Sequence, residues 1–186
     1  MKWSLSLAAV ALLGCASNAG NAPAPPPPCD QSCQDGIALR AVREAMKTAY
    51  NHLLTGRDAG PQDASTPCPL GGSVHVYGTA TSNAAQGATI VQLTYAFDHC
   101  KYLRVDTDPL QNYAVTLNAT ITEGGTLAVQ PTSTTSLNLA ADALDLTGTV
   151  HDPALDYAAS ACALQLGQDG NQLSGLLCGR KAGVSL

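Results

Sequence analysis

The feature that most constrains the fold is an alternation of apolar and polar residues that begins at Ser73 and continues almost to the end of the chain. Half-buried antiparallel strands alternate in this way, whereas buried parallel strands read as continuous apolar runs. The alternating runs are 74–80, 91–97, 113–121, 127–129, 137–141, 144–150, 161–166 and 173–177. The pattern predicts about eight short antiparallel strands, with turns at residues 123–125, 151–153 and 169–170.

One helix is predicted ahead of these strands. Between Ile37 and Leu54 the apolar side chains recur at i, i+3 and i+4, and Gly56 is a natural stop. The same spacing predicts a solvent-exposed helix face formed by Arg40, Arg43, Glu44 and Lys47. Residues 57–69 are rich in turn-forming residues and are expected to form a loop.

These elements predict a mainly β fold. A sheet of half-buried strands must cover its apolar face against another layer. We therefore expect an antiparallel β-sandwich or a partly closed barrel, with the one N-terminal helix packed on it.

The N-terminus has the layout of an export signal. Lys2 is followed by a short apolar run from Leu5 to Leu13, about half the length that a helix needs to span a bilayer. The run closes with Leu12-Leu13-Gly14-Cys15, which resembles the lipobox of bacterial lipoproteins. This resemblance covers the first fifteen residues. It implies acylation of the Cys15 thiol, with palmitate among the attached chains, and cleavage between Gly14 and Cys15.

The composition divides the chain into three parts. Residues 1–14 form the expected signal peptide, and residues 15–28 form a lipidated N-terminus and a proline-rich linker, because small polar residues and prolines cannot bury enough apolar area to fold. Residues 29–186 form the expected β-domain with its leading helix. The strand run from Cys68 to Cys100 also resembles segments of uncharacterised secreted bacterial lipoproteins.

Seven cysteines are present, an odd number for an exported protein. If Cys15 carries the lipid, the other six can form three disulfides in an oxidising compartment. Cys68 and Cys100 fall nearly opposite each other in a hairpin that turns near Ala85, and Cys162 and Cys178 do so in a hairpin that turns at 169–170. Elimination leaves the pair Cys29–Cys33. We therefore predict the disulfides 29–33, 68–100 and 162–178.

The charge of the chain limits its partners. The formal net charge is −5, which disfavours nucleic acid and anionic lipid, because both are bound chiefly by clustered lysine and arginine. The expected attachment to a membrane is through the lipid on Cys15. Ala16 rather than aspartate follows this cysteine, a pattern that in lipoproteins implies export to the outer membrane.

No local motif for catalysis or metal binding is present. The four histidines, His52, His75, His99 and His151, form no spaced metal-binding pair, and a disulfide-bonded Cys100 beside His99 cannot be a thiolate ligand. The residues Asp106-Thr107-Asp108-Pro109 are interpreted as a turn whose aspartates cap backbone amides. Glu44 and Glu123, the two glutamates, are expected on a helix face and in a turn. We predict no catalytic residue, no metal and no cofactor.

The resulting functional hypothesis is a lipoprotein of the bacterial cell envelope, tethered at Cys15, that acts as a structural or protein-interaction module with an unknown envelope protein as partner. One alternative is a periplasmic carrier of a small apolar ligand, since a barrel of about eight strands can enclose a cavity lined by residues such as Leu137, Leu139 and Ala141. A less favoured alternative is an enzyme without a recognisable motif.

Overall fold

The protein consists of one helix and one antiparallel sheet in the computed structural model, which describes residues 28–83, 87–128 and 134–186. The elements are, in chain order, α1 (Gln31–Leu53), β1 (Gly60–Pro67), β2 (Ser73–Asn83), β3 (Ala88–Arg104), the short 3-10 helix η2 (Pro109–Gln111), β4 (Tyr113–Ala128), β5 (Ser136–Val150), β6 (Leu155–Asp169), β7 (Gln172–Leu177) and β8 (Arg180–Ser185). Each strand pairs with the next one along the chain, so the sheet order is the sequence order.

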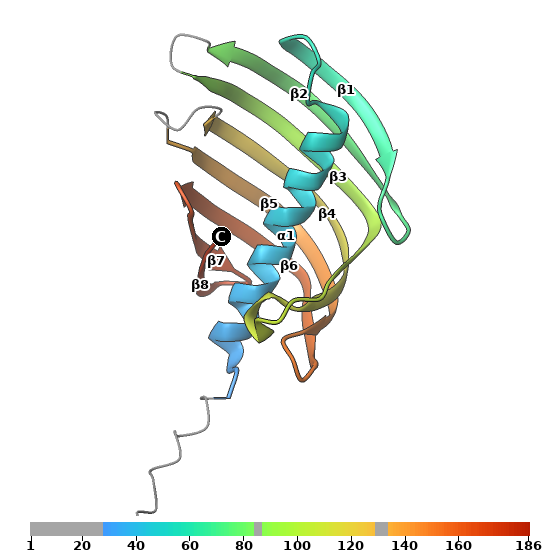
Figure 1. Cartoon of the computed structure of the whole chain (residues 1–186), viewed down its shortest axis with the longest axis vertical. Coiled ribbons are helices and arrows are strands. Elements are labelled where there is room, and N and C mark those ends of the chain that lie inside the picture. Colours follow the sequence, from blue (N-terminus) through green and yellow to red (C-terminus); the bar gives the residue numbers. More distant parts are fainter. Residues whose placement is uncertain (1–27, 84–86, 129–133) are drawn as a thin grey trace, which may run out of the picture.

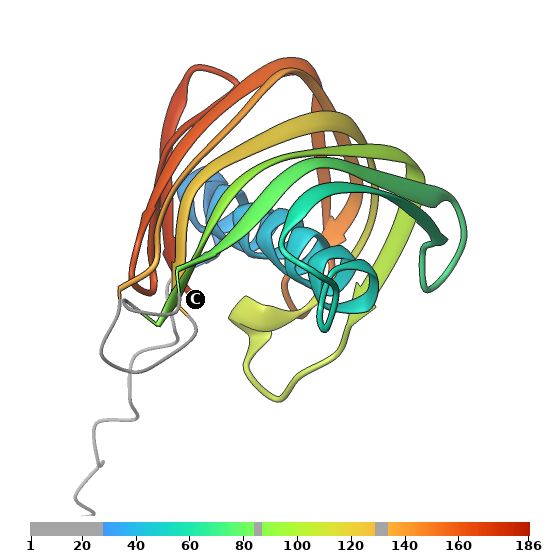
Figure 2. The ribbon, with the colours of Figure 1, turned by 90° about the horizontal axis from the view of Figure 1, so that it is seen from above.

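The sheet is strongly curved and wraps around α1, which lies along its concave face (Figures 1 and 2). The first and last strands, β1 and β8, form the two ends of the sheet order and do not pair with each other. The expected mainly β, antiparallel fold with one packed helix is confirmed. The sheet is not closed into a barrel, and the helix supplies the second layer of a sandwich-like arrangement.

A single hydrophobic core fills the space between α1 and the sheet. The helix contributes a face that includes Leu39 and Met46, both with no exposed surface, and the sheet contributes the inward members of each alternating run. Leu137, Leu139 and Ala141 lie in this core, 2%, 2% and 6% exposed. Because the helix occupies the concave face, these residues pack against protein rather than around a cavity.

The helix begins earlier than its apolar periodicity predicts, at Gln31 instead of Ile37. Asp30 is its N-cap, and the Asp30 carboxylate accepts a hydrogen bond of 3.0 Å from the backbone N–H of Cys33. The first two turns lack an apolar stripe, so the pattern alone did not indicate them. The other end agrees with expectation, since Leu54 is the C-cap.

The segment predicted as a loop, residues 57–69, contains the edge strand β1. Its prolines, Pro61 and Pro67, lack the N–H that a central strand must donate, but an edge strand tolerates them because one side of its backbone has no neighbour in the sheet. The expectation of a loop was therefore wrong.

Three long strands, β3, β5 and β6, contain β-bulges that shift the alternation of apolar residues. The runs 137–141 and 144–150 were expected to be separate strands, but they belong to the single strand β5, whose pairing with β6 shifts between Ala141 and Leu144. In β3 a shift between Phe97 and Cys100 likewise carries the strand on to Arg104. A bulge inserts an extra residue and so changes which residues face inward.

The expected turn at residues 123–125 is instead the continuation of β4. Gly125 pairs with Leu137 of β5 and adopts a φ of 137°. A Cβ atom at this position would collide with the backbone carbonyl of Ser136, so only glycine fits here without displacement. Gly125 therefore serves a close approach between strands rather than a chain reversal.

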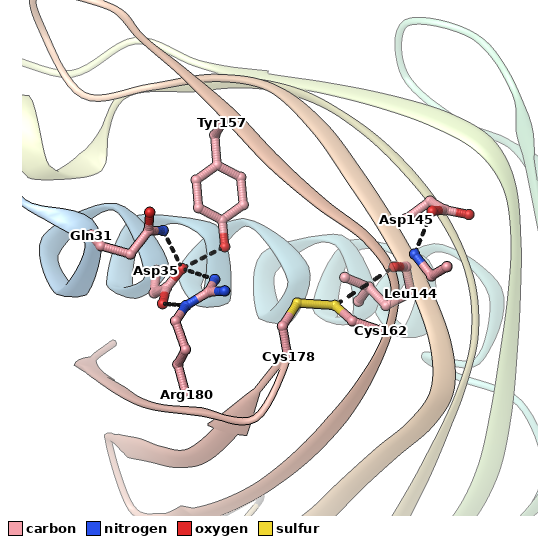
Figure 3. The surroundings of a disulfide bond; sticks show 9 residues. Gln31, Asp35, Leu144, Asp145, Tyr157, Cys162, Cys178 and Arg180 are labelled. Atoms are coloured by element: carbon pink, nitrogen blue, oxygen red, sulfur yellow. Dashed lines mark hydrogen bonds and ion pairs between the residues drawn. A yellow bond between two sulfur atoms is a disulfide. The ribbon is translucent and has the colours of Figure 1, made fainter.

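The structure joins the six cysteines of the domain in the pairs Cys29–Cys33, Cys68–Cys100 and Cys162–Cys178, with Cα–Cα distances of 5.2, 5.4 and 4.9 Å. The first pair spans the start of α1, and the third lies beyond the paired ends of β6 and β7 (Figure 3). The second differs from the proposed cross-strand bridge, because Cys68 lies in the turn between β1 and β2 and is bonded from there to β3.

Replacement of Leu39 by alanine tests the packing of α1 on the concave face. Leu39 has no exposed surface, so the expected loss in the free energy of unfolding is about 2–5 kcal/mol, measured by urea denaturation. The matched control is Leu70→Ala, because Leu70 is 56% exposed and should change stability by less than about 0.5 kcal/mol. Equal effects at the two positions would contradict the described packing.

Candidate functional site

The most unusual feature of the interior is a buried pair of opposite charges, Arg43 of α1 and Glu123 of β4. The Arg43 Nη1 and Glu123 Oε1 atoms lie 3.3 Å apart, and the side chains are 10% and 1% exposed. Tyr95 of β3 donates a 2.6 Å hydrogen bond to the other oxygen of Glu123, and Arg43 Nε donates a 2.7 Å hydrogen bond to Gln168 of β6. Three strands and the helix thus meet at one polar cluster.

The positions of this pair correct two expectations. Arg43 was expected on the exposed face of the helix, but it follows Leu39 by four residues and precedes Met46 by three, which places it on the buried face. Glu123 was expected in a turn, but it lies in β4, in phase with the inward residues Ala119 and Ile121.

The pair forms part of a pocket of about 460 Å³ beside α1. The pocket lies between the second half of the helix, the end of β4, the β6–β7 turn and the C-terminal residue, which is marked C in Figures 1 and 2. Its lining residues are Arg43, Glu44, Lys47, Tyr50, Asn51, Glu123, Leu127, Ala128, Thr135, Gln168, Gly170, Asn171 and Leu186. The size is that of a small-molecule site.

Burial dominates the electrostatics of this cluster. It raises the pKa of Glu123, against the opposing effects of Arg43 and of the hydrogen bond from Tyr95. Burial, together with the neighbouring carboxylate, also raises the pKa of Tyr95, so the phenol stays protonated and acts as a donor. Glu123 Oε1 has no hydrogen-bond partner among the described residues. A buried charge without a full set of hydrogen bonds is costly, so this oxygen marks a position suited to a donor.

A second buried cluster surrounds Asp35, near the start of α1 (Figure 3). Arg180 of β8 donates two hydrogen bonds to the Asp35 carboxylate, of 2.9 and 2.8 Å, and Tyr157 of β6 donates a third of 2.8 Å. Gln31 donates a fourth, of 2.9 Å. The Asp35 side chain is 1% exposed, and its oxygens are fully engaged within the protein. This cluster attaches the helix to the last strand, and the Asp35 oxygens are taken up by hydrogen bonds within the protein.

A third polar cluster fixes the loop between β3 and β4. Arg104 contacts Glu44, Asp106 and Gln111, and Tyr113 donates a 2.6 Å hydrogen bond to Glu44. Within the loop, Asp106 accepts from the backbone N–H of Asp108, and Asp108 accepts from that of Leu110. The interpretation of these aspartates as caps of backbone amides is confirmed.

The four histidines lie in different elements: His52 in α1, His75 in β2, His99 in β3 and His151 in the turn after β5. His75 is a partly exposed strand residue and lies 2.8 Å from Asp63. His99 contacts the neighbouring Asp98, at 2.6 Å, while Cys100 is bonded to Cys68. His52 lies in the last turn of α1. Over the ranges 28–83, 87–128 and 134–186, no three or more His, Cys, Asp or Glu side chains are arranged to hold a metal ion.

Cys15, the predicted lipidation site, lies outside the described residues, as does most of the proline-rich segment. In the part of the chain that is described, no helix has both the length and the apolar character needed to cross a membrane.

Comparison with known proteins gives no assignment: no protein-family model, no curated protein and no solved structure matches this chain.

Replacing one member of the Arg43–Glu123 pair is expected to lower the free energy of unfolding strongly, whereas replacing both members together is expected to lower it much less. The single variant Arg43→Met leaves a buried carboxylate unpaired, and the expected loss in the free energy of unfolding is about 3–5 kcal/mol. The double variant Arg43→Met/Glu123→Leu removes both charges and should recover most of that loss, measured by urea denaturation at pH 7. Arg57→Met, at an exposed arginine, is the control for loss of one positive charge. A double variant less stable than the single one would contradict the pairing.

The Asp35 cluster is expected to make stability depend on acid pH. Burial alone would raise the pKa of Asp35, but the hydrogen bonds from Arg180, Tyr157 and Gln31 outweigh it and lower the pKa below its ordinary value. The folded state therefore binds this proton less readily than the unfolded state. The stabilisation is present above the unfolded pKa of about 3.9 and is lost as the pH falls through the folded value.

Urea denaturation of the wild type and of Asp35→Asn at pH 7 and pH 3 measures this effect. The difference in stability between the two proteins should be largest at pH 7 and should shrink at pH 3. Tyr157→Phe removes one of the donors to Asp35. Its free energy of unfolding at pH 7 should lie between the values for the wild type and for Asp35→Asn. A difference that is the same at both pH values would show that the carboxylate charge does not contribute.

Proposed function

We propose that this chain is a lipid-anchored lipoprotein of the bacterial cell envelope, attached through Cys15 and directed to the outer membrane. The observation that carries the proposal is the pairing of the cysteines. Six of the seven are bonded to one another in three disulfides, which leaves Cys15, the cysteine of the lipobox-like sequence, as the one available for acylation. Three disulfides also fit an oxidising compartment outside the cytoplasm.

The domain acts as a protein-interaction module that is held at a fixed distance from the membrane. The residues between Cys15 and the first helix include four consecutive prolines, a composition typical of an extended, semi-rigid spacer. The disulfides and the buried polar clusters hold the domain in one conformation, which lowers the entropic cost of binding a partner. Two or more acyl chains, each adding about 0.8 kcal/mol per buried CH₂, give a stable anchor.

The alternative of a carrier with an apolar interior is less favoured by the structure. The concave face of the sheet, which would line such a cavity, is covered by α1 and forms the core. The pocket beside the helix contains two cationic and two anionic side chains and is not an apolar site.

Metabolic labelling with a clickable palmitate analogue tests the anchor. We expect label on the wild type in the membrane fraction, and no label and a soluble protein for Cys15→Ser. Ser17→Ala, in the same segment, is the control and should behave as the wild type. Ala16→Asp should move the protein from the outer to the inner membrane on a sucrose gradient. Label retained in Cys15→Ser would contradict the assignment of the anchor.

Cross-linking in intact cells followed by purification tests the interaction module. A stoichiometric envelope protein should be captured with the wild type and lost with Cys15→Ser. If neither form captures a partner, the proposed interaction function is wrong, although the anchor stands on its own test.

A further inference from the structure

The buried Glu123 carboxylate has one oxygen that accepts no hydrogen bond from the described residues. Oε2 accepts from the hydroxyl of Tyr95, while Oε1 has only the ion pair with Arg43 Nη1, at 3.3 Å. Buried acceptors in folded proteins are nearly always hydrogen-bonded, so an unsatisfied one in a pocket wall is suited to a donor supplied by a bound water or by the hydroxyl group of a ligand. Glu123 lines the pocket and its side chain is 1% exposed, so a ligand in the pocket reaches this oxygen only if the neighbouring side chains shift.

We propose that this pocket binds a neutral, hydroxylated small molecule of monosaccharide or disaccharide size, which donates a hydroxyl hydrogen to Glu123. The proposal does not rest on the lipid anchor, because it concerns residues of the folded domain alone. The pocket volume of about 460 Å³ lies within the range of about 300–1,000 Å³ typical of small-molecule sites.

The charge balance of the pocket favours a neutral ligand over an ionic one. Its ionisable side chains are two cations, Arg43 and Lys47, and two anions, Glu44 and Glu123. An ammonium group at Glu123 Oε1 would lie beside the Arg43 guanidinium, and like charges at that distance repel. An anionic group next to Arg43 would face Glu123 in the same way. A hydroxyl group satisfies the free oxygen without adding a charge.

The mouth of the pocket offers groups that match several hydroxyls at once. Asn51 on α1 and Asn171 in the β6–β7 turn are exposed, and each amide both donates and accepts hydrogen bonds. Tyr50 and Leu127 add partly buried apolar surface for the C–H groups of a sugar ring. Donors, acceptors and apolar surface are therefore all present in the lining of the pocket that contains Glu123.

The test is titration of the full-length protein, with its disulfides formed, by isothermal calorimetry and amide chemical shifts. The neutral probes are glucose, N-acetylglucosamine and maltose, and the charged counterparts are glucosamine and glucuronate. We expect at least one neutral probe to bind and to shift the amide resonance of Gly170, and to bind about tenfold more tightly than its charged counterparts, a difference equal to about 1.4 kcal/mol.

Two variants narrow the exposed part of the pocket, one from the helix and one from the β6–β7 turn. Asn51→Trp on the helix and Asn171→Trp in the turn should each weaken binding by about tenfold or more, because an indole ring fills space that the ligand needs. Asn138→Trp, the same change at an exposed position of β5 that does not line the pocket, is the matched control and should bind as the wild type. Thermal unfolding of each variant verifies that it is folded.

Three results would overturn the proposal. Failure of all three neutral probes to bind would show that the free oxygen is satisfied without such a ligand. Tighter binding of glucosamine than of glucose would show that the donor to Glu123 is an ammonium group and not a neutral hydroxyl group. Binding that both mouth variants leave unchanged would place the ligand elsewhere.

Discussion

The structure depends on the placement of one helix inside one curved sheet. An eight-stranded sheet that does not close leaves an apolar concave face, and α1 covers it with a stripe that includes Leu39 and Met46. Two buried polar clusters fix the helix at different points along its length. Asp35 attaches its first turns to β8, and Arg43 attaches its middle to β4 and β6. Because each cluster spans the helix and the sheet, each favours one position and rotation of the helix.

This arrangement has a direct consequence for function. A helix that fills the concave face removes the apolar cavity that a curved sheet would otherwise enclose, so ligands are restricted to the margin between helix and sheet. The pocket at that margin contains Arg43 and Glu123, which also connect α1 to β4. The same two side chains thus position the helix and line the pocket. The Asp35 cluster, by contrast, is saturated with internal hydrogen bonds and is structural.

The fold follows from the sequence more completely than the site does. The alternation after Ser73 and the single amphipathic segment before it predict the strands, the helix and their packing, because burial of one face dictates both patterns. Bulges hid the continuity of β5, since an extra residue inverts the phase of the alternation. Arg43 and Glu123 were missed because charge was taken as a sign of exposure. Their spacing from neighbouring apolar residues indicated that both side chains face inward. That they lie close together could not be predicted, because it depends on how α1 packs on β4.

The central claim is that Cys15 is the acylated residue and the other six cysteines are bonded to one another. Intact and peptide mass spectrometry of the protein extracted from membranes, after alkylation without reduction, tests both halves at once. The account predicts a mature chain that starts at an acylated Cys15, three disulfides, and no alkylated cysteine. An N-terminus elsewhere with an unmodified Cys15, or an alkylated cysteine within residues 29–186, would contradict it.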